Sequence, residues 1–102
     1  MPMIKVAAAS DLAPGQVMEV QTSDRSFALC NLNGHLHCLD GTCPHAGGPL
    51  GQGALEGDLL VCPWHGYEFH CATGTNDSDE DLMVETFKVV VQDGSIFIDV
   101  PE

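Results

Sequence analysis

Two short segments of this chain place a cysteine and a histidine close enough to bind one metal centre. The first is Cys43-Pro44-His45, and the second is Cys62-Pro63-Trp64-His65-Gly66. A thiolate and an imidazole at such short spacing can reach one site from one loop. The two segments together therefore offer two sulfur and two nitrogen ligands.

Two kinds of metal centre use this set of ligands. Tetrahedral zinc binds two Cys and two His in many small domains. A [2Fe–2S] cluster can also bind them, with two Cys on one iron and two His on the other. Common zinc fingers draw a Cys pair from one turn and a His pair from a helix. Here each loop supplies one Cys and one His, and no helix is predicted, so the interleaved order favours the cluster.

The elements that must position these loops are short strands. Asn33-Gly34 and Asp93-Gly94 are strong signals for two-residue hairpins, and Glu56-Gly57-Asp58 indicates a third. Many short strands at this spacing predict an all-β protein, a small antiparallel sandwich or barrel. The expected strands are Ile4–Ala7, Val17–Thr22, Ser26–Leu32, His35–Leu39, Leu59–Cys62, Tyr67–His70, Val84–Val91 and Ser95–Val100.

One region interrupts the strand pattern. Residues 41–74 contain most of the chain's glycines, three prolines and three of the five cysteines. Loops rich in Gly and Pro around Cys and His indicate backbone held tightly around an inorganic group. We therefore expect an inserted lobe at about 41–74 on a β base formed by residues 1–40 and 75–102, all within one domain.

The two loops resemble the Rieske family. The resemblance rests on Cys43-Pro44-His45-Ala46-Gly47-Gly48-Pro49-Leu50 and Cys62-Pro63-Trp64-His65-Gly66-Tyr67-Glu68-Phe69, and it extends over all 102 residues. It implies a single Rieske-type domain with one [2Fe–2S] cluster. Cys43 and Cys62 would bind the buried iron, and His45 and His65 would bind the outer iron near the surface.

The resemblance also implies surroundings for the cluster. Backbone N–H groups near Gly47, Trp64 and Gly66 would point at the sulfurs and stabilise the reduced state, and Tyr67 would lie beside them. High-potential respiratory members carry a disulfide where this chain has Gly48 and Trp64. They also carry hydroxyl groups where Tyr67 and Phe69 stand here. These departures, with the negative charge, predict a low potential, near the lower limit of about −150 mV for Rieske centres.

Charge and hydropathy exclude several functions. Fifteen acids against three bases give a net charge of −12, which excludes a free-standing nucleic-acid binder and disfavours an anionic membrane surface. No apolar run approaches the roughly 18 residues of a membrane span. We therefore expect a soluble cytoplasmic protein. Residues 56–102 carry a net charge of −10, and their acids, including Glu56, Asp58, Glu68 and residues 77–81, could steer a basic partner.

The resemblance implies an electron carrier without a substrate of its own. It looks like a soluble ferredoxin that accepts one electron from a flavin-dependent reductase and delivers it to the terminal oxygenase of an aromatic-ring-hydroxylating dioxygenase. Such a carrier is expected to be a monomer. The alternatives are a Rieske-like small subunit of an NAD(P)H-dependent nitrite reductase and a zinc-stabilised interaction module.

The remaining Cys, His and Phe residues are interpreted as structural. Cys30 and Cys38 lie on expected strands as small buried side chains, and Cys71 is interpreted as a bystander in the lobe. His35 and His37 share one strand face and could chelate a metal, although polar residues are ordinary after a turn. The expected core of the β base is Phe27, Phe87, Phe97, Val89, Val91, Ile96 and Ile98.

Overall fold

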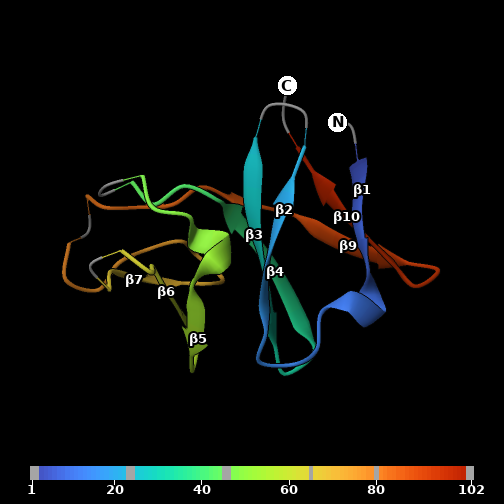
Figure 1. Ribbon diagram of the computed structural model, residues 1–102, viewed down its shortest axis with the longest axis horizontal. Coiled ribbons are helices and arrows are strands. Elements are labelled where there is room, and N and C mark those ends of the chain that lie inside the picture. Colours follow the sequence, from blue (N-terminus) through green and yellow to red (C-terminus); the bar gives the residue numbers. More distant parts are fainter. Residues whose placement is uncertain (1–2, 23–24, 45–46, 65, 80, 101–102) are drawn as a thin grey trace.

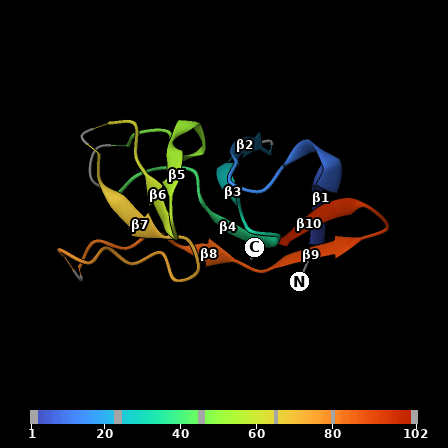
Figure 2. The ribbon, with the colours of Figure 1, turned by 90° about the horizontal axis from the view of Figure 1, so that it is seen from below.

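The computed structural model describes residues 3–22, 25–44, 47–64, 66–79 and 81–100. In these ranges ten strands form three antiparallel sheets that follow one another along the length of the molecule (Figures 1 and 2). Within the described ranges the only helical segments are two 3-10 turns, Ala9–Asp11 (η1) and Leu50–Gln52 (η2). The all-β prediction is confirmed.

The terminal sheet joins the two ends of the chain. Its strands are β1 (Met3–Ala8), β10 (Ser95–Asp99) and β9 (Val89–Gln92), in the order β1-β10-β9. The β9–β10 hairpin turns at Asp93-Gly94, where both residues have positive φ, 53° and 76°. That backbone matches the right-handed twist of a tight hairpin, as the sequence predicted.

The central sheet is formed by β2 (Val17–Gln21), β3 (Ser26–Leu32), β4 (His35–Asp40) and β8 (Thr86–Phe87), in chain order. The β3–β4 hairpin turns at Asn33-Gly34, again with two positive φ angles. Its register is regular from Leu32 opposite His35 to Phe27 opposite Asp40. This sheet separates the other two in Figure 2.

The third sheet carries the segments next to the cysteine loops. It comprises β5 (Ala54–Glu56), β6 (Leu59–Val61) and β7 (Glu68–His70). Its first hairpin turns at Gly57, as the Glu56-Gly57-Asp58 signal predicted. The 3-10 turn η2 precedes β5 and packs on β2 of the central sheet, so this end of the molecule is tied to the centre.

Burial on both faces of β3 creates two cores. Alternate residues of this strand face opposite sides, and Phe27 to Cys30 are all fully buried. The core toward the third sheet, here the lobe-side core, contains Ala28, Cys30, Leu39, Cys43, Leu50, Leu60, Cys62, Phe69, Cys71 and Val84. The core toward the terminal sheet contains Leu12, Val20, Phe27, Leu29, Cys38, Phe87, Ile96 and Ile98.

Two expectations about the C-terminal strands are wrong. Residues 84–91 do not form one strand, because β8 pairs with β4 of the central sheet while β9 pairs with β10 of the terminal sheet. The chain therefore changes sheets at Lys88. Phe97 is only half-buried, because it alternates with the buried Ile96 and Ile98 and lies on the opposite face of the sheet. Val91, near the end of the edge strand β9, is 50% exposed.

Arg25 links β8 to β3 across the central sheet. Its guanidinium lies 5.2 Å from the ring centroid of Phe27 and 5.0 Å from that of Phe87, and it forms ion pairs with Asp40 at 3.2 Å and Glu85 at 3.6 Å. The two rings also meet edge to face, with centroids 5.1 Å apart. Partly exposed ion pairs contribute little individually, so the aromatic contacts dominate.

Gly74, which follows β7, lies against the backbone of Val84, which precedes β8. We expect Gly74→Ala to be strongly destabilising. Its φ is +77°, and a Cβ there would lie 2.0 Å from the Val84 carbonyl oxygen. Gly94 has a similar φ of +76° but open space around it, so Gly94→Ala is the matched control. Gly94→Ala should lower the free energy of unfolding by about 1 kcal/mol and Gly74→Ala by at least about 3 kcal/mol. Chemical denaturation measures both, and equal losses would contradict the steric argument.

Candidate metal centre

The first cysteine loop is closed by its own backbone. The Cys43 N–H donates to the Gly48 carbonyl oxygen at 2.8 Å, and the Gly47 N–H donates to the Cys43 carbonyl oxygen at 2.8 Å. Thr42 and Pro49 pair as an isolated β-bridge at its base. These contacts fix the Cys43 backbone at the edge of the lobe-side core. His45, predicted as a ligand, lies outside the described residues.

The second cysteine loop connects β6 to β7. The Cys62 N–H donates to the Tyr67 carbonyl oxygen at 2.7 Å, which closes the loop in the same way as the first. The Trp64 N–H donates to the Cys62 sulfur at 3.4 Å. His65 lies between these contacts in the sequence but outside the described residues.

The fold brings Cys43 and Cys62 together. Each is only 1% exposed, both belong to the lobe-side core, and their sulfurs interact directly. Burial raises the pKa of the Cys62 thiol, and the nearby Cys43 raises it further, against the opposing effect of the Trp64 N–H. All five cysteines are described, and all are free thiols. Two adjacent buried sulfurs suit a metal cation, which would replace their protons.

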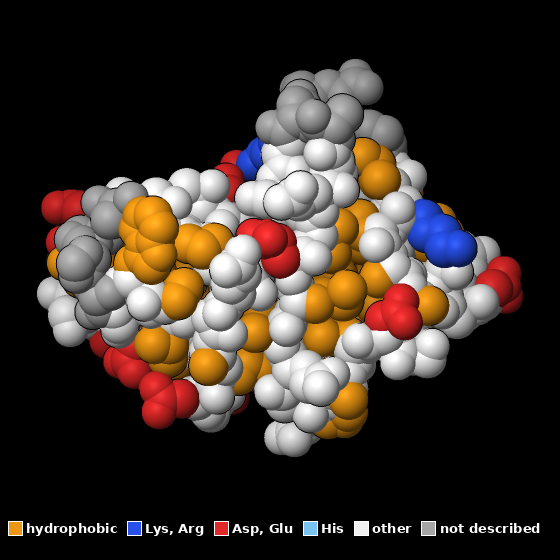
Figure 3. Space-filling view, in the orientation of Figure 1, with side chains coloured by type: hydrophobic (Ala, Val, Ile, Leu, Met, Phe, Trp, Pro, Cys, Tyr) orange, Lys and Arg blue, Asp and Glu red, His pale blue; other side chains and the backbone are white. Residues whose placement is uncertain are grey.

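Gly48 and Trp64 lie against the Cys62 sulfur. A Cβ at Gly48 would lie 2.9 Å from the Cys62 sulfur and 3.0 Å from the Trp64 ring, so the first loop passes directly over the second. The Trp64 side chain remains 49% exposed. An apolar patch lies over these loops at the left end of the molecule in Figure 3. The thiols are therefore shielded by a thin layer at one end of the fold.

Comparison with known proteins decides the family. The family model of the Rieske [2Fe–2S] domain matches residues 2–88. The chain belongs to the Rieske family. It accordingly holds one Rieske-type [2Fe–2S] cluster, and the paired buried cysteines fit the thiolate half of such a centre.

Full-length relatives are ferredoxin components. The chain is 31% identical to the ferredoxin CarAc of Metapseudomonas resinovorans, over 93% of this chain and 91% of that protein. It is 33% identical to the ferredoxin subunit of 3-phenylpropionate/cinnamic acid dioxygenase from Shigella flexneri, over 91% and 89%.

Solved structures show the same fold. A ferredoxin in complex with the oxygenase of carbazole 1,9a-dioxygenase has a TM-score of 0.86 and 31% identity, over 94% of this chain and 91% of that one. The small subunit of an NADH-dependent nitrite reductase from Mycobacterium tuberculosis has a TM-score of 0.88 over 99% and 97%, but only 21% identity. The latter resemblance shows the fold alone.

The residues predicted to surround the cluster make several contacts in the structure. The Trp64 N–H does point at a cysteine sulfur. The Gly47 N–H instead donates to a carbonyl oxygen of its own loop, so its contribution is to shape the turn. Gly66 has a φ of +72°, and Tyr67 is half-buried against the lobe-side core. Phe69 is fully buried in that core, and it has no hydroxyl group that would need a hydrogen-bond partner there.

The acids do not all lie near the cysteine loops. Glu68 and Asp79 line a hollow together with Gly66 and Tyr67, directly beside the second loop. Asp58 lines a different groove, on the side of the third sheet that faces β4. Red side chains along the lower left of Figure 3 mark acidic surface at the same end as the loops. The structure thus separates acids that the sequence grouped together.

The structure places the Cys and His side chains that were interpreted as structural. Cys30 and Cys38 are buried as predicted, on opposite faces of the central sheet. His35 and His37 share a face of β4, but among the described residues no three Cys, His, Asp or Glu side chains group as metal ligands.

Sequence reasoning missed the contact of His70 Nε2 with Asp77 Oδ1, at 2.8 Å. A helix long and apolar enough to cross a membrane does not occur in the described part of the chain.

Gly48 provides a test of how tightly the loops must pack. We expect Gly48→Ala to weaken retention of the cluster, because its Cβ would push against the Cys62 sulfur and the Trp64 ring. Changes this close to a metal site typically cost about tenfold or more in affinity. The rate of iron loss to a chelator measures the effect. Gly57→Ala is the control, since Gly57 lies in the β5–β6 turn with open space around it, and it should retain iron like the wild type.

Proposed function

We propose that this chain is the ferredoxin component of a ring-hydroxylating dioxygenase system, carrying single electrons to the terminal oxygenase. The observation that carries the proposal is the pair of buried cysteines beneath an exposed Trp64, in a chain similar over its full length to ferredoxin components. A complex between such a ferredoxin and its oxygenase is among the similar structures. A flavin-dependent reductase as donor, a monomeric state and a cytoplasmic location are part of this proposal.

We further propose four ligands for the cluster. Cys43 and Cys62 would hold one iron as thiolates, and His45 and His65 the other through imidazole nitrogen. The adjacent sulfurs of the two cysteines support the first pair, and the spacing of the sequence supports the second. When bound, the cluster accepts and releases one electron.

The residues around this site have separate tasks in electron transfer. The Trp64 N–H points at the Cys62 sulfur and would stabilise negative charge there. That negative charge would be greater when the cluster is reduced. Gly48 and the Trp64 ring would limit access of water to the Cys62 sulfur. The division into a lobe at about 41–74 and a base at 1–40 and 75–102 belongs to the proposal, and the third sheet at residues 54–70 supports it.

A fixed subunit of a nitrite reductase is a second candidate. It is favoured only by similarity of fold at 21% identity or less, whereas the sequence relatives above 30% identity include dioxygenase ferredoxins. A carrier exchanges between partners and a subunit stays bound, so purification of the protein from its native host with its partners separates the two.

Metal analysis tests the proposed ligands. The purified protein should be red-brown, with about two irons and two acid-labile sulfides per chain. His45→Ala and His65→Ala should each abolish the Rieske-type visible and electron paramagnetic resonance spectra, because each removes a ligand of the outer iron. His35→Ala is a matched control and should leave the spectra unchanged. A colourless protein with one zinc per chain would refute the cluster.

Salt dependence tests docking at the acidic end. Exposed charges are screened over about 8 Å at physiological ionic strength, so steering by them falls as salt rises. Raising salt from roughly 0.05 to 0.5 M should slow reduction of the cluster by a flavin-dependent ferredoxin reductase several-fold, with little change in potential. Stopped-flow absorption measures the rate.

Paired variants locate the charges responsible for that salt effect. Neutralising Glu68 and Asp79 (Glu68→Gln with Asp79→Asn) should reproduce most of the salt effect, because both lie beside the second cysteine loop. Asn at position 79 keeps the acceptor that holds the Asp81 N–H. The matched control, Glu56→Gln with Asp58→Asn, removes the same charge from the β5–β6 turn, at the other end of β6 from Cys62. Equal rates for the two pairs would mean that the acids only confer solubility.

A further inference from the structure

The terminal sheet has an open edge at β9. This strand is last in the order β1-β10-β9, and among the described residues no further strand pairs with it. The Asp99 N–H donates to the Lys88 carbonyl oxygen at 3.0 Å, so the backbone groups of Lys88 and, by alternation, Val90 bond toward β10. The N–H and C=O groups of Val89 and Val91 therefore point away from β10, where another strand could bond to them.

The β9 strand lacks the features that usually protect a sheet edge from pairing. Natural edge strands carry charges, proline or bulges. At the other edge of this sheet, β1 has an irregular register between Lys5 and Ala7. By contrast, β9 has a regular register and the sequence Val-Val-Val-Gln, and its Val91 is 50% exposed. An apolar strand thus lies at an unprotected edge.

A hollow of about 350 Å³ lies beside this edge, on the outer face of the terminal sheet, the face opposite Ile96 and Ile98. Its lining residues are Met3, Lys88, Val90, Gln92, Phe97 and Asp99. The register sets Phe97 opposite Val90, so their side chains share this face. Met3 is 41% exposed and Phe97 is half-buried, so the hollow has an accessible apolar floor.

The outer face also carries two of the three bases of the chain. Lys88 lines the hollow, and Lys5 is paired with Phe97 across the strands. The third base, Arg25, is already paired with two acids in the central sheet. Asp99 is the acid in the hollow, but it lies on β10, one strand further from the edge than Lys88. Exposed charges act over only about 8 Å, so a carboxylate at the β9 edge would meet Lys88 first.

We propose that the β9 edge is a docking site for an extended segment of a partner protein, which adds to the terminal sheet as an antiparallel strand. Its backbone bonds to the outward groups of Val89 and Val91. On the outer face it places a carboxylate beside Lys88 and a large apolar side chain beside Val90, and the latter enters the hollow toward Phe97. In this mode the backbone bonds supply affinity and the alternate side chains supply specificity.

A second copy of this chain fits the edge less well. In the antiparallel register that bonds Val89 to the second Val91, each Lys88 would face Gln92 rather than a carboxylate. A segment held at β9 would also leave the candidate metal centre accessible, because the terminal and third sheets lie at opposite ends of the molecule in Figure 2. The docking site does not rest on the proposed electron-transfer function.

The probe is a synthetic peptide with this pattern, acetyl-Thr-Asn-Val-Leu-Val-Glu-Thr-amide. In an antiparallel strand its Leu lies opposite Val90 and its Glu opposite Lys88. The peptide is titrated into isotope-labelled holoprotein, and two-dimensional NMR follows the amide signals while visible absorption monitors the cluster. The control peptide, acetyl-Thr-Val-Asn-Leu-Glu-Val-Thr-amide, has the same composition but puts Leu and Glu on opposite faces.

The amide signals of residues 89–92 should shift to saturation, with no change in visible absorption, and the control peptide should bind at least about tenfold more weakly. Lys88→Glu should weaken binding about fivefold and favour a peptide with Lys in place of Glu. Val91→Pro removes an outward N–H that the sheet does not use, so it should fold and lose binding. Lys5→Glu is the matched control, with the same charge change two strands away, and should bind like the wild type.

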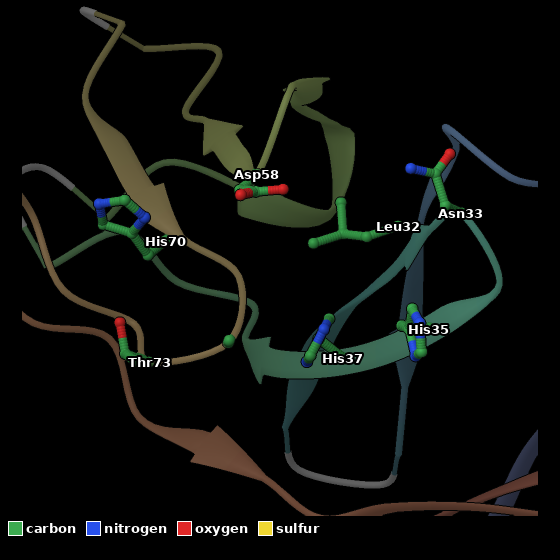
Figure 4. Close-up of a pocket in the computed structure, with 8 residues that line it drawn as sticks. Leu32, Asn33, His35, His37, Asp58, His70 and Thr73 are labelled. Carbon is green, nitrogen blue, oxygen red and sulfur yellow. The ribbon is translucent and has the colours of Figure 1, made fainter.

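Three results would overturn the docking site. The first is the absence of shifts at β9 with peptide at about 1 mM. The second is a set of shifts centred on the larger groove of about 480 Å³ between β4 and the third sheet, which Figure 4 shows with His35, His37 and His70 around it. The third is self-association in sedimentation that Val91→Pro removes, because the edge would then belong to a second copy. The charge swap at Lys88 decides the first two even if Val91→Pro fails to fold.

Discussion

The double-sided burial of β3 is the constraint on which the rest of the structure depends. A chain of 102 residues can bury little apolar surface, and here one strand serves two cores. Phe27 and Leu29 face the terminal sheet, while Ala28 and Cys30 face the third sheet. The cysteine loops have almost no regular structure of their own, so they are held in place through the core that β3 shares with them.

That arrangement explains how irregular loops can hold two sulfurs in fixed positions. Each loop is closed by one backbone hydrogen bond at its cysteine, to Gly48 in the first and Tyr67 in the second. Each cysteine is also packed into the lobe-side core. A metal site gains from such pre-organisation because little chain entropy remains to be lost on binding. The surface layer of Trp64 stays thin, which keeps the distance from cluster to partner short.

Local signals made much of the fold predictable, and tertiary contacts account for what they missed. The turn at Asn33-Gly34 was identified because only a few residue types adopt positive φ, and the cysteine loops because their ligand types are rare together. The change of sheet at Lys88 has no local signal, since the residues on both sides favour strands. The half-exposed Phe97 likewise depends on what covers each face of the terminal sheet, which periodicity alone does not reveal.

The site shows the same limit for residues that meet only in space. Cys30 and Cys71 belong to the same core, although nothing in their own segments indicates that the end of β7 packs on β3. Glu68 and Asp79 are neighbours of the second cysteine loop, whereas Asp58, closer to it along the chain than Asp79, faces another groove. Distance along the chain therefore does not predict which of these acids lies nearer the second cysteine loop. Because electrostatic attraction and thiol chemistry both act over short distances, packing of the third sheet on the central one decides which charges and sulfurs can act together.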